Sequence, residues 1–147
     1  MVEILPAASS QLEEIYLLIC ELEGTPVSRK GFSACYRQNL ENPQVHYFVA
    51  QEGGRVLGFI SLHIQQLLHH AAKVAEIQEL VVCGQLRGQG IGKLLFAAAK
   101  EAAVREGCLQ LEVCCNRSRV MSHTFYLRQG MTNRHFKFCL PLRETKG

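Results

Sequence analysis

Residues 85–93 read QLRGQGIGK and separate two segments of different periodicity. Residues 75–82 (AEIQELVV) are typical of a largely apolar strand, whereas the apolar residues 91, 94, 95, 98 and 102 fall on one face of a helix. A glycine-rich turn that leads into a helix presents free backbone N–H groups, which bind anions and above all phosphates. Arg87 and Lys93 add positive charge at the same place. The stretch therefore predicts a binding site for a phosphorylated cofactor.

Three phosphate-binding motifs were compared with this stretch. The dinucleotide motif G-x-G-x-x-G fails because Lys93 occupies its last glycine position. The P-loop G-x-x-x-x-G-K-[ST] fails because Arg87 takes its first glycine position and Leu94 follows Gly92-Lys93. The pattern Q-x-x-G-x-G is matched at every defining position, by Gln85, Gly88 and Gly90. A turn without any ligand is disfavoured, because three glycines are costly at a helix start unless something must approach the backbone closely.

Composition limits the class of protein. A chain of 147 residues predicts one domain, residues 1–147, with 48% hydrophobic and 20% charged residues, as in soluble globular proteins. The net charge of +3 comes without a basic stripe, so no nucleic-acid partner is expected. The apolar runs are too short to cross a membrane, and no signal peptide is visible. The seven cysteines follow no disulfide framework, which predicts free thiols and a cytoplasmic location.

The periodicity along the chain predicts alternating strands and helices. The expected strands are 2–6, 45–51, 56–67, 73–83, 108–115 and 133–142, with a hairpin turn at 52–55. The expected helices run from a Ser9 or Ser10 cap to Gly24, over 28–41, from the glycine loop to Glu106, and over 119–129. This order predicts a mixed α/β fold.

The Q-x-x-G-x-G loop, with its preceding strand and following helix, resembles the pyrophosphate loop of the GCN5-related N-acetyltransferases (GNAT), which bind acetyl-coenzyme A (acetyl-CoA). The resemblance covers essentially the whole chain. It implies a mostly antiparallel sheet in which the central strand and the next one splay apart around the cofactor's pantetheine. It also implies a bulge that frees backbone N–H groups near Val81 and Val82 for the thioester oxygen. The implied cofactor-binding residues are Leu80, Val81, Val82, Arg87, Gly88, Gln89, Gly90, Ile91, Gly92 and Lys93, with Asn116 and Arg128 as candidates for the pantetheine or phosphate arm.

Acetyl transfer to an amine needs a base, because a primary amine is mostly protonated at neutral pH. Glu76 and Glu79 precede the loop on the central strand, and their spacing puts them on opposite faces unless a bulge intervenes. Glu79 is the favoured base. The resemblance implies that Tyr126, in the context Phe-Tyr-Leu-Arg-Gln-Gly, protonates the leaving thiolate. A Cys83 acetyl-enzyme is disfavoured, because no activating group is implied beside Cys83.

Three segments resemble a narrower group, the bacterial aminoalkylphosphonate N-acetyltransferases. They are residues 18–22 (LICEL), residues 62–82 with their histidines, and residues 125–136. The resemblance implies a small-molecule amine acceptor and a divalent metal, for which the candidate ligands are His63, His69, His70 and Glu76. Arg29, Lys30 and Arg37 are candidate partners for a phosphonate.

Several alternatives stay open on the sequence. The acceptor could instead be a polyamine, an aminoglycoside or a protein amine. A non-catalytic acyl-CoA-binding module is the alternative outside enzymes. The chain could also form a homodimer, on which the sequence is silent.

Overall fold

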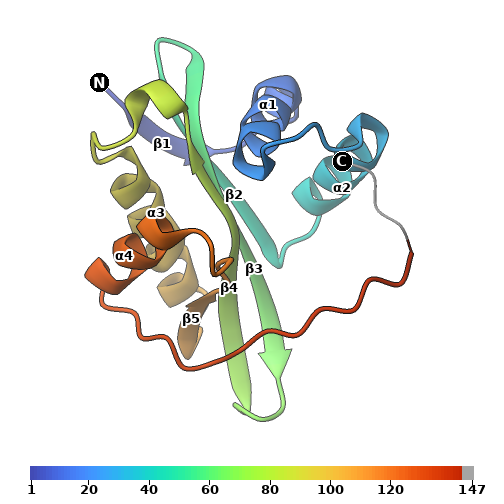
Figure 1. Cartoon of the computed structure of the whole chain (residues 1–147), viewed down its shortest axis with the longest axis vertical. Helices are drawn as coiled ribbons and strands as arrows, with labels where there is room; N and C mark the ends of the chain where they lie inside the picture. The colour runs from blue at the N-terminus through green and yellow to red at the C-terminus, as the bar shows by residue number, and fades with distance from the viewer. Residues whose placement is uncertain (144–147) are drawn as a thin grey trace.

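The computed structural model describes residues 1–143 and contains a five-stranded sheet with the order β1-β2-β3-β4-β5 (Figure 1). The strands are β1 (Glu3–Pro6), β2 (Val45–Glu52), β3 (Arg55–Leu67), β4 (Ala72–Val82) and β5 (Gln110–Val113). The first four strands pair antiparallel, and β5 pairs parallel to β4. The predicted mixed α/β fold with a mostly antiparallel sheet is confirmed.

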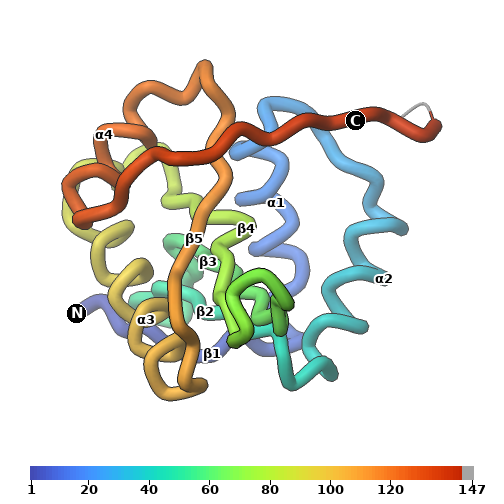
Figure 2. Tube along the Cα trace, turned by 90° about the horizontal axis from the view of Figure 1, so that it is seen from below, coloured from blue at the N-terminus to red at the C-terminus, as the bar shows by residue number. Residues whose placement is uncertain are grey.

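The helices cover both faces of this sheet. The helices α1 (Leu12–Glu23) and α2 (Arg29–Leu40) lie on one face, and α3 (Ile91–Arg105) and α4 (Val120–Arg128) on the other (Figure 2). Each face has its own core: Leu95 of α3 packs with Ile60, and Ile15 of α1 packs with Phe59. Burying a side chain of this size contributes about 1.5–3 kcal/mol. Within residues 1–143, no helix is long and apolar enough to cross a membrane.

The ends of α1 and α2 follow local rules. Gly24, with a left-handed φ of 75°, ends α1 as predicted, and the Ser28 hydroxyl caps α2 by accepting a hydrogen bond from the Gly31 N–H at 3.0 Å. The predicted serine cap of α1 is wrong. Residues 9–11 form a turn of 3-10 helix with no serine cap, and the Gln11 side chain accepts from the Ala8 N–H instead.

The pairing of β3 with β4 contains a bulge. Ser61 is opposite Glu79 and Leu62 is opposite Ile77, so Gln78 is an extra residue in β4. The extra residue changes the alternation of side chains, and Glu76 and Glu79 therefore share one face of the sheet, the face of Ser61 and of α1 and α2. The opposite-face arrangement of a regular strand does not occur, and the bulge implied by the family resemblance is present.

The strands β4 and β5 splay apart beyond the bulge. β5 pairs with residues 74–77, and within residues 1–143 no strand pairs with the rest of β4 on that edge. The N–H groups of Glu79 and Cys83 point toward β3, where they donate to the Ser61 hydroxyl and the Leu57 carbonyl. Successive N–H groups of a strand point to alternate edges. Leu80 and Val82 therefore direct theirs to the open edge.

The prediction of a last strand over residues 133–142 is wrong for this structure. The segment contains no strand, and it crosses from the α4 side to the α1 and α2 side instead of running along β5 (Figures 1 and 2). A strand forms only where a neighbour satisfies its backbone groups. The alternating apolar side chains that suggested a strand are left 81–94% exposed; they are Phe136, Phe138, Leu140 and Leu142.

Candidate active site

The glycine loop between β4 and α3 leaves a helix end uncapped by side chains. Gly88 and Gly90 have left-handed φ values of 82° and 84°, and Gly90 is the residue that precedes α3. A Cβ atom at either glycine would meet no atom within 4 Å, so the loop backbone faces open space. The first N–H groups of α3 have no acceptor within the helix. The loop can therefore hold an anionic group, as the sequence predicted.

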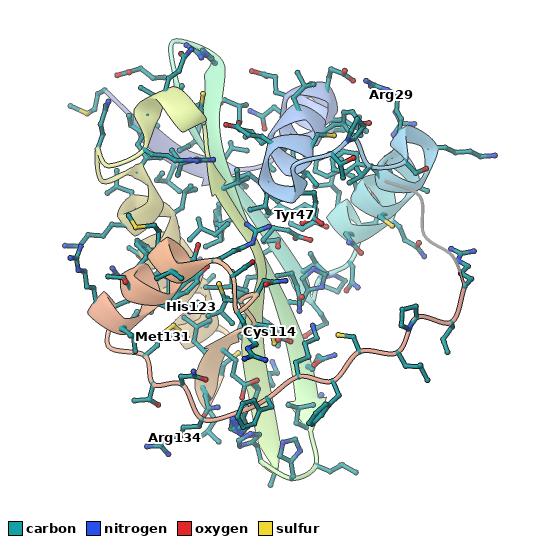
Figure 3. All side chains as sticks on the ribbon, viewed as in Figure 1. Arg29, Tyr47, Cys114, His123, Met131 and Arg134 are labelled. Atoms are coloured by element: carbon teal, nitrogen blue, oxygen red, sulfur yellow. The ribbon has the colours of Figure 1, made fainter. Side chains whose placement is uncertain are left out.

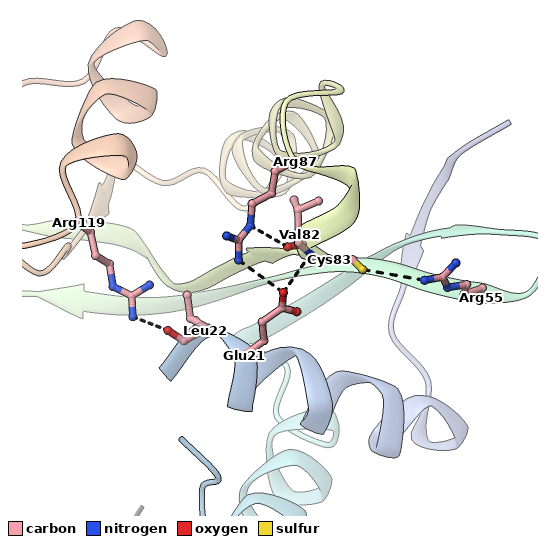
Figure 4. Close-up of polar contacts among 8 residues, drawn as sticks. Glu21, Leu22, Arg55, Val82, Cys83, Arg87 and Arg119 are labelled. Carbon is pink, nitrogen blue, oxygen red and sulfur yellow. Dashed lines mark hydrogen bonds and ion pairs between the residues drawn. The ribbon is translucent and has the colours of Figure 1, made fainter. Parts of the chain in front are cut away.

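Contacts from α1 order the entrance of this loop (Figure 4). The Glu21 carboxylate accepts a hydrogen bond from the Gly84 N–H at 3.0 Å and lies 3.7 Å from the Arg87 guanidinium. Arg87 also donates to the Val82 carbonyl at 3.4 Å. These contacts tie the Arg87 guanidinium to α1 and to the end of β4, just before the glycine loop.

A cleft of about 270 Å³ opens where β4 and β5 splay apart. It is lined by β4, by the end of β5 with the loop that follows, and by the facing ends of α1 and α4; the residues are Leu22, Glu23, Gln78, Glu79, Leu80, Val113, Cys114, Cys115, Asn116, Arg119, Ser122 and Tyr126. The cleft brings together four of the predicted residues, namely Glu79, Leu80, Asn116 and Tyr126. Arg128 is exposed in the last turn of α4 and does not line it.

A second cavity of about 350 Å³ lies between the sheet and the helices α1 and α2. Aromatic rings form part of its wall, and the lining residues are Ile15, Ile19, Phe32, Cys35, Tyr36, Asn39, Tyr47, Phe59, His63, Gln78 and Glu79. Gln78 and Glu79 line both cavities. The bulge is therefore the wall at which the two cavities meet.

The Glu79 carboxylate is held by Ser61. The Ser61 hydroxyl donates a hydrogen bond to Glu79 Oε1 and accepts one from the Glu79 N–H at 2.9 Å. Ser61 is completely buried. The sequence analysis missed this residue, although a serine inside the otherwise apolar run of residues 56–62 was a usable signal.

Tyr126 stands on α4 with its ring against Phe96 of α3. Burial is the main cause that raises the pKa of Tyr126 to about 12, with a smaller raising effect of Cys115 and an opposing one of Arg119. Within residues 1–143 its hydroxyl has no hydrogen-bond partner. The hydroxyl therefore keeps its proton at neutral pH and is free to donate it into the cleft.

The cysteines of the site are poor nucleophiles. Burial raises the pKa of the Cys114 thiol, helped by its hydrogen bond to Glu76, and burial also raises the pKa of the Cys115 thiol. A protonated thiol attacks a thioester slowly. Cys83 has the Arg55 guanidinium 4.0 Å from its sulfur, a cation that the sequence did not lead us to expect (Figure 4). Cys83 lines neither cavity, however.

The four candidate metal ligands are not assembled. His69 and His70 lie in the turn between β3 and β4, where their rings are 4.4 Å apart and His70 faces Glu112 at 3.9 Å. His63 and Glu76 are opposite one another in the β3–β4 pair, but Glu76 accepts from the Cys114 thiol. Among the residues that the structure describes, no three His, Cys, Asp or Glu side chains are placed to hold a metal ion. The geometry does not fit the expected metal site.

The basic residues of α2 do not reach the second cavity. Arg29 pairs with Glu13 and lies 4.4 Å above the Tyr16 ring. Figure 3 shows Arg29 at the outer end of α2, whereas Tyr47 lies over the sheet. Neither Lys30 nor Arg37 lines the cavity. The three cations therefore lie outside this cavity, and their pairing with a phosphonate stays a prediction.

The open glycine loop, the splayed strands and the shared wall at Glu79 define an acyl-CoA-dependent transferase. The chain belongs to the acetyltransferase (GNAT) family, whose model matches residues 12–131. It is an acetyl-CoA-dependent N-acetyltransferase.

This chain is similar in sequence to a curated relative and similar in structure to two solved acetyltransferases. The aminoalkylphosphonate N-acetyltransferase of Salmonella typhimurium is 43% identical over 140 residues, which are 95% of this chain and 91% of that relative. An acetyltransferase of Trypanosoma brucei superposes with a TM-score of 0.80 at 25% identity, over 97% of this chain and all of that one. An aminoglycoside N-acetyltransferase in complex with CoA superposes with a TM-score of 0.87 at 18% identity, over 97% of this chain and 95% of that one.

The loop geometry predicts a specific defect for Gly90→Glu. The new side chain brings a negative charge to the uncapped start of α3, and we expect acetyl-CoA binding to weaken at least about a hundredfold, or about 2.7 kcal/mol. Gly54→Glu is the matched control, because Gly54 also has a positive φ (77°) and open space around its Cβ position but lies in the β2–β3 turn. Calorimetry should show weakened binding for Gly90→Glu alone; equal affinities of the two variants would contradict the anion site.

Proposed function

We propose that this protein transfers the acetyl group of acetyl-CoA to the primary amine of a small aminoalkylphosphonate by direct attack. The observation that carries the proposal is the meeting of two cavities at Glu79, one for each substrate. The pyrophosphate binds at residues 87–93, and the pantetheine follows the cleft between β4 and β5. The acceptor occupies the cavity beneath α1 and α2, whose volume of about 350 Å³ suits a small molecule.

Each proposed catalytic group acts on one atom. Glu79 takes the proton of the ammonium group, and the neutral nitrogen then bonds to the thioester carbon. The Leu80 N–H, directed to the open edge of β4, stabilises the negative charge on the thioester oxygen. The carbon–sulfur bond breaks, and Tyr126 gives its proton to the departing thiolate. The second amine proton leaves the new amide nitrogen and returns to Tyr126 through solvent, and Glu79 releases its proton to solvent. Asn116 lies in the same cleft and is proposed to contact the pantetheine.

The phosphonate acceptor is supported by the 43% identity to the Salmonella typhimurium enzyme and by one feature of the cavity. His63 stands two residues beyond Ser61, which is opposite Glu79, so His63 lies about 6–7 Å along the strand from Glu79. No Lys or Arg is among the described residues that line this cavity. We propose that His63, with Asn39 and Tyr47, binds the phosphonate while the amine faces Glu79.

Tyr126→Phe should lower kcat by about 10²–10⁴-fold and leave the KM for acetyl-CoA nearly unchanged, because the hydroxyl acts only as charge develops on sulfur. Tyr16→Phe is the control, since Tyr16 donates to the Val27 carbonyl at 2.7 Å and lines neither cavity. Steady-state kinetics at saturating acceptor make the comparison. Full kcat in Tyr126→Phe would remove the residue from the mechanism.

The acceptor is tested with aminomethylphosphonate, 1-aminoethylphosphonate, glycine, spermidine and a lysine peptide under identical conditions, with and without added divalent metal. A carboxylate is planar and carries less charge than a phosphonate, so it leaves part of the anion site unpaired. We expect kcat/KM for aminomethylphosphonate to exceed that for glycine at least about tenfold, or about 1.4 kcal/mol.

His63→Ala should remove most of this preference while acetyl-CoA hydrolysis in the absence of amine stays unchanged. A preference for spermidine or the peptide in the unmodified enzyme would contradict the phosphonate acceptor and leave the acetyltransferase activity in place.

We also propose that the chain, acting as one catalytic domain over residues 1–147, forms a homodimer through its C-terminal segment. In the part of the chain that the structure describes, the alternating exposed side chains of 133–142 lack a neighbour and the outer edge of β5 lacks a paired strand, so two copies could satisfy both needs by exchanging this segment. Phe136→Ser with Phe138→Ser should shift the mass in light scattering from two chains to one; a monomeric unmodified protein would contradict the proposal.

The free state of all seven cysteines supports a cytoplasmic location.

A further inference from the structure

Ser61 is the one polar residue that is fully buried in the part of the chain that the structure describes. It stands in the middle of β3 between Ile60 and Leu62, both of which face the α3 core. A buried hydroxyl is costly unless it is hydrogen-bonded. Both of its hydrogen bonds given by the structure go to a single residue, Glu79.

These two hydrogen bonds occur at the bulge. The register between β3 and β4 shifts directly after Ser61, where the regular ladder of carbonyl acceptors is interrupted. The Ser61 oxygen accepts from the Glu79 N–H at 2.9 Å, so a side chain supplies the acceptor at this position. The same hydroxyl donates to Glu79 Oε1. Ser61 therefore fixes the backbone and the carboxylate of Glu79 together.

We infer that Ser61 is a positioning residue for the reaction, which holds the Glu79 carboxylate across the wall between the two cavities. The inference rests on the proposed role of Glu79 as the base. Because Oε1 is occupied by the Ser61 hydroxyl, Oε2 is the oxygen that takes the proton from the amine. A carboxylate held in this way cannot turn away from the acceptor between turnovers.

Other titratable or charged groups line the two cavities that Glu79 lines, and among residues 1–143 none of them makes a hydrogen bond to Glu79. They are Glu23 of α1, Cys35 and Tyr36 of α2, Tyr47 of β2, His63 of β3, Cys114, Cys115 and Arg119 beyond β5, and Tyr126 of α4. Burial is the main cause that raises the pKa of Tyr47, and the Glu79 charge adds to it. All of these groups stay in place when only Ser61 is changed.

The test is the pH dependence of kcat/KM for Ser61→Ala. A hydrogen bond to the charged form of a carboxylate favours that form, so its loss should move the acidic limb of the pH–rate profile to higher pH. We expect kcat/KM at neutral pH to fall about tenfold or more while the KM for acetyl-CoA stays unchanged. Ser61→Thr keeps the hydroxyl and should restore the acidic limb to its original position.

Ile60→Val is the matched control, because it weakens the same strand through the opposite face and leaves the hydroxyl in place. This variant should lower the midpoint temperature of thermal unfolding without moving the acidic limb of the kcat/KM profile. An unmoved limb in a folded Ser61→Ala protein would overturn the inference. Should Ser61→Ala fail to fold, Ser61→Cys replaces it, with the same expected shift and the same contradicting result.

Glu79→Gln separates this inference from the proposed function. We expect the variant to lose most activity, and adding Ser61→Ala to it should cause little further loss, because Ser61 acts through Glu79. Full activity of Glu79→Gln would defeat the proposed mechanism itself. The third outcome is a Glu79→Gln protein that loses most activity and a double variant that loses as much again as Ser61→Ala loses alone. That outcome would defeat only the role of Ser61.

Discussion

One inserted residue in β4 determines the geometry of the whole site. Gln78 has no partner on β3, and the two carboxylates on either side of it are thereby brought to the same face of the sheet. The parallel pairing with β5 stops one residue before the insertion, so the strands separate from that point on. Both cavities, the open N–H groups of β4 and the Ser61–Glu79 contact all lie at this bulge.

The surroundings of the site set which group holds a proton. Burial keeps the Tyr126 hydroxyl protonated, with a pKa of about 12, and it also raises the pKa values of the Cys114 and Cys115 thiols. The Glu79 carboxylate, in contrast, accepts one hydrogen bond, from the Ser61 hydroxyl on the neighbouring strand, and it lines the second cavity. In the proposed mechanism, this arrangement puts one proton acceptor, Glu79, beside the amine and one proton donor, Tyr126, beside the sulfur.

The sequence predicted the features that depend on local chemistry. Gly88 and Gly90 indicated the loop, because a left-handed backbone conformation favours glycine. The helices and the first five strands were predicted from the periodicity of apolar residues. Features that depend on pairing across the sheet were not predictable from the residues alone. The position of the bulge needs the register of β3 against β4, and the role of Ser61 follows from that register.

The failed predictions have the same origin. Residues 133–142 alternate like a strand, but alternation does not supply a neighbour, and the segment passes the sheet instead of joining it. His63, His69 and His70 are close in sequence, yet β3 is long enough to carry His69 and His70 to a distant turn. Closeness along the chain does not bring these side chains together in space.

The central claim is that both substrates occupy adjoining cavities at the same time and that the acetyl group passes directly between them. Initial velocities measured over a grid of acetyl-CoA and aminomethylphosphonate concentrations test it most directly. Direct transfer predicts double-reciprocal lines that intersect, and no acetylated protein in mass spectra of enzyme incubated with acetyl-CoA alone. Parallel lines, together with an acetyl-enzyme that is consumed when the amine is added, would contradict the account.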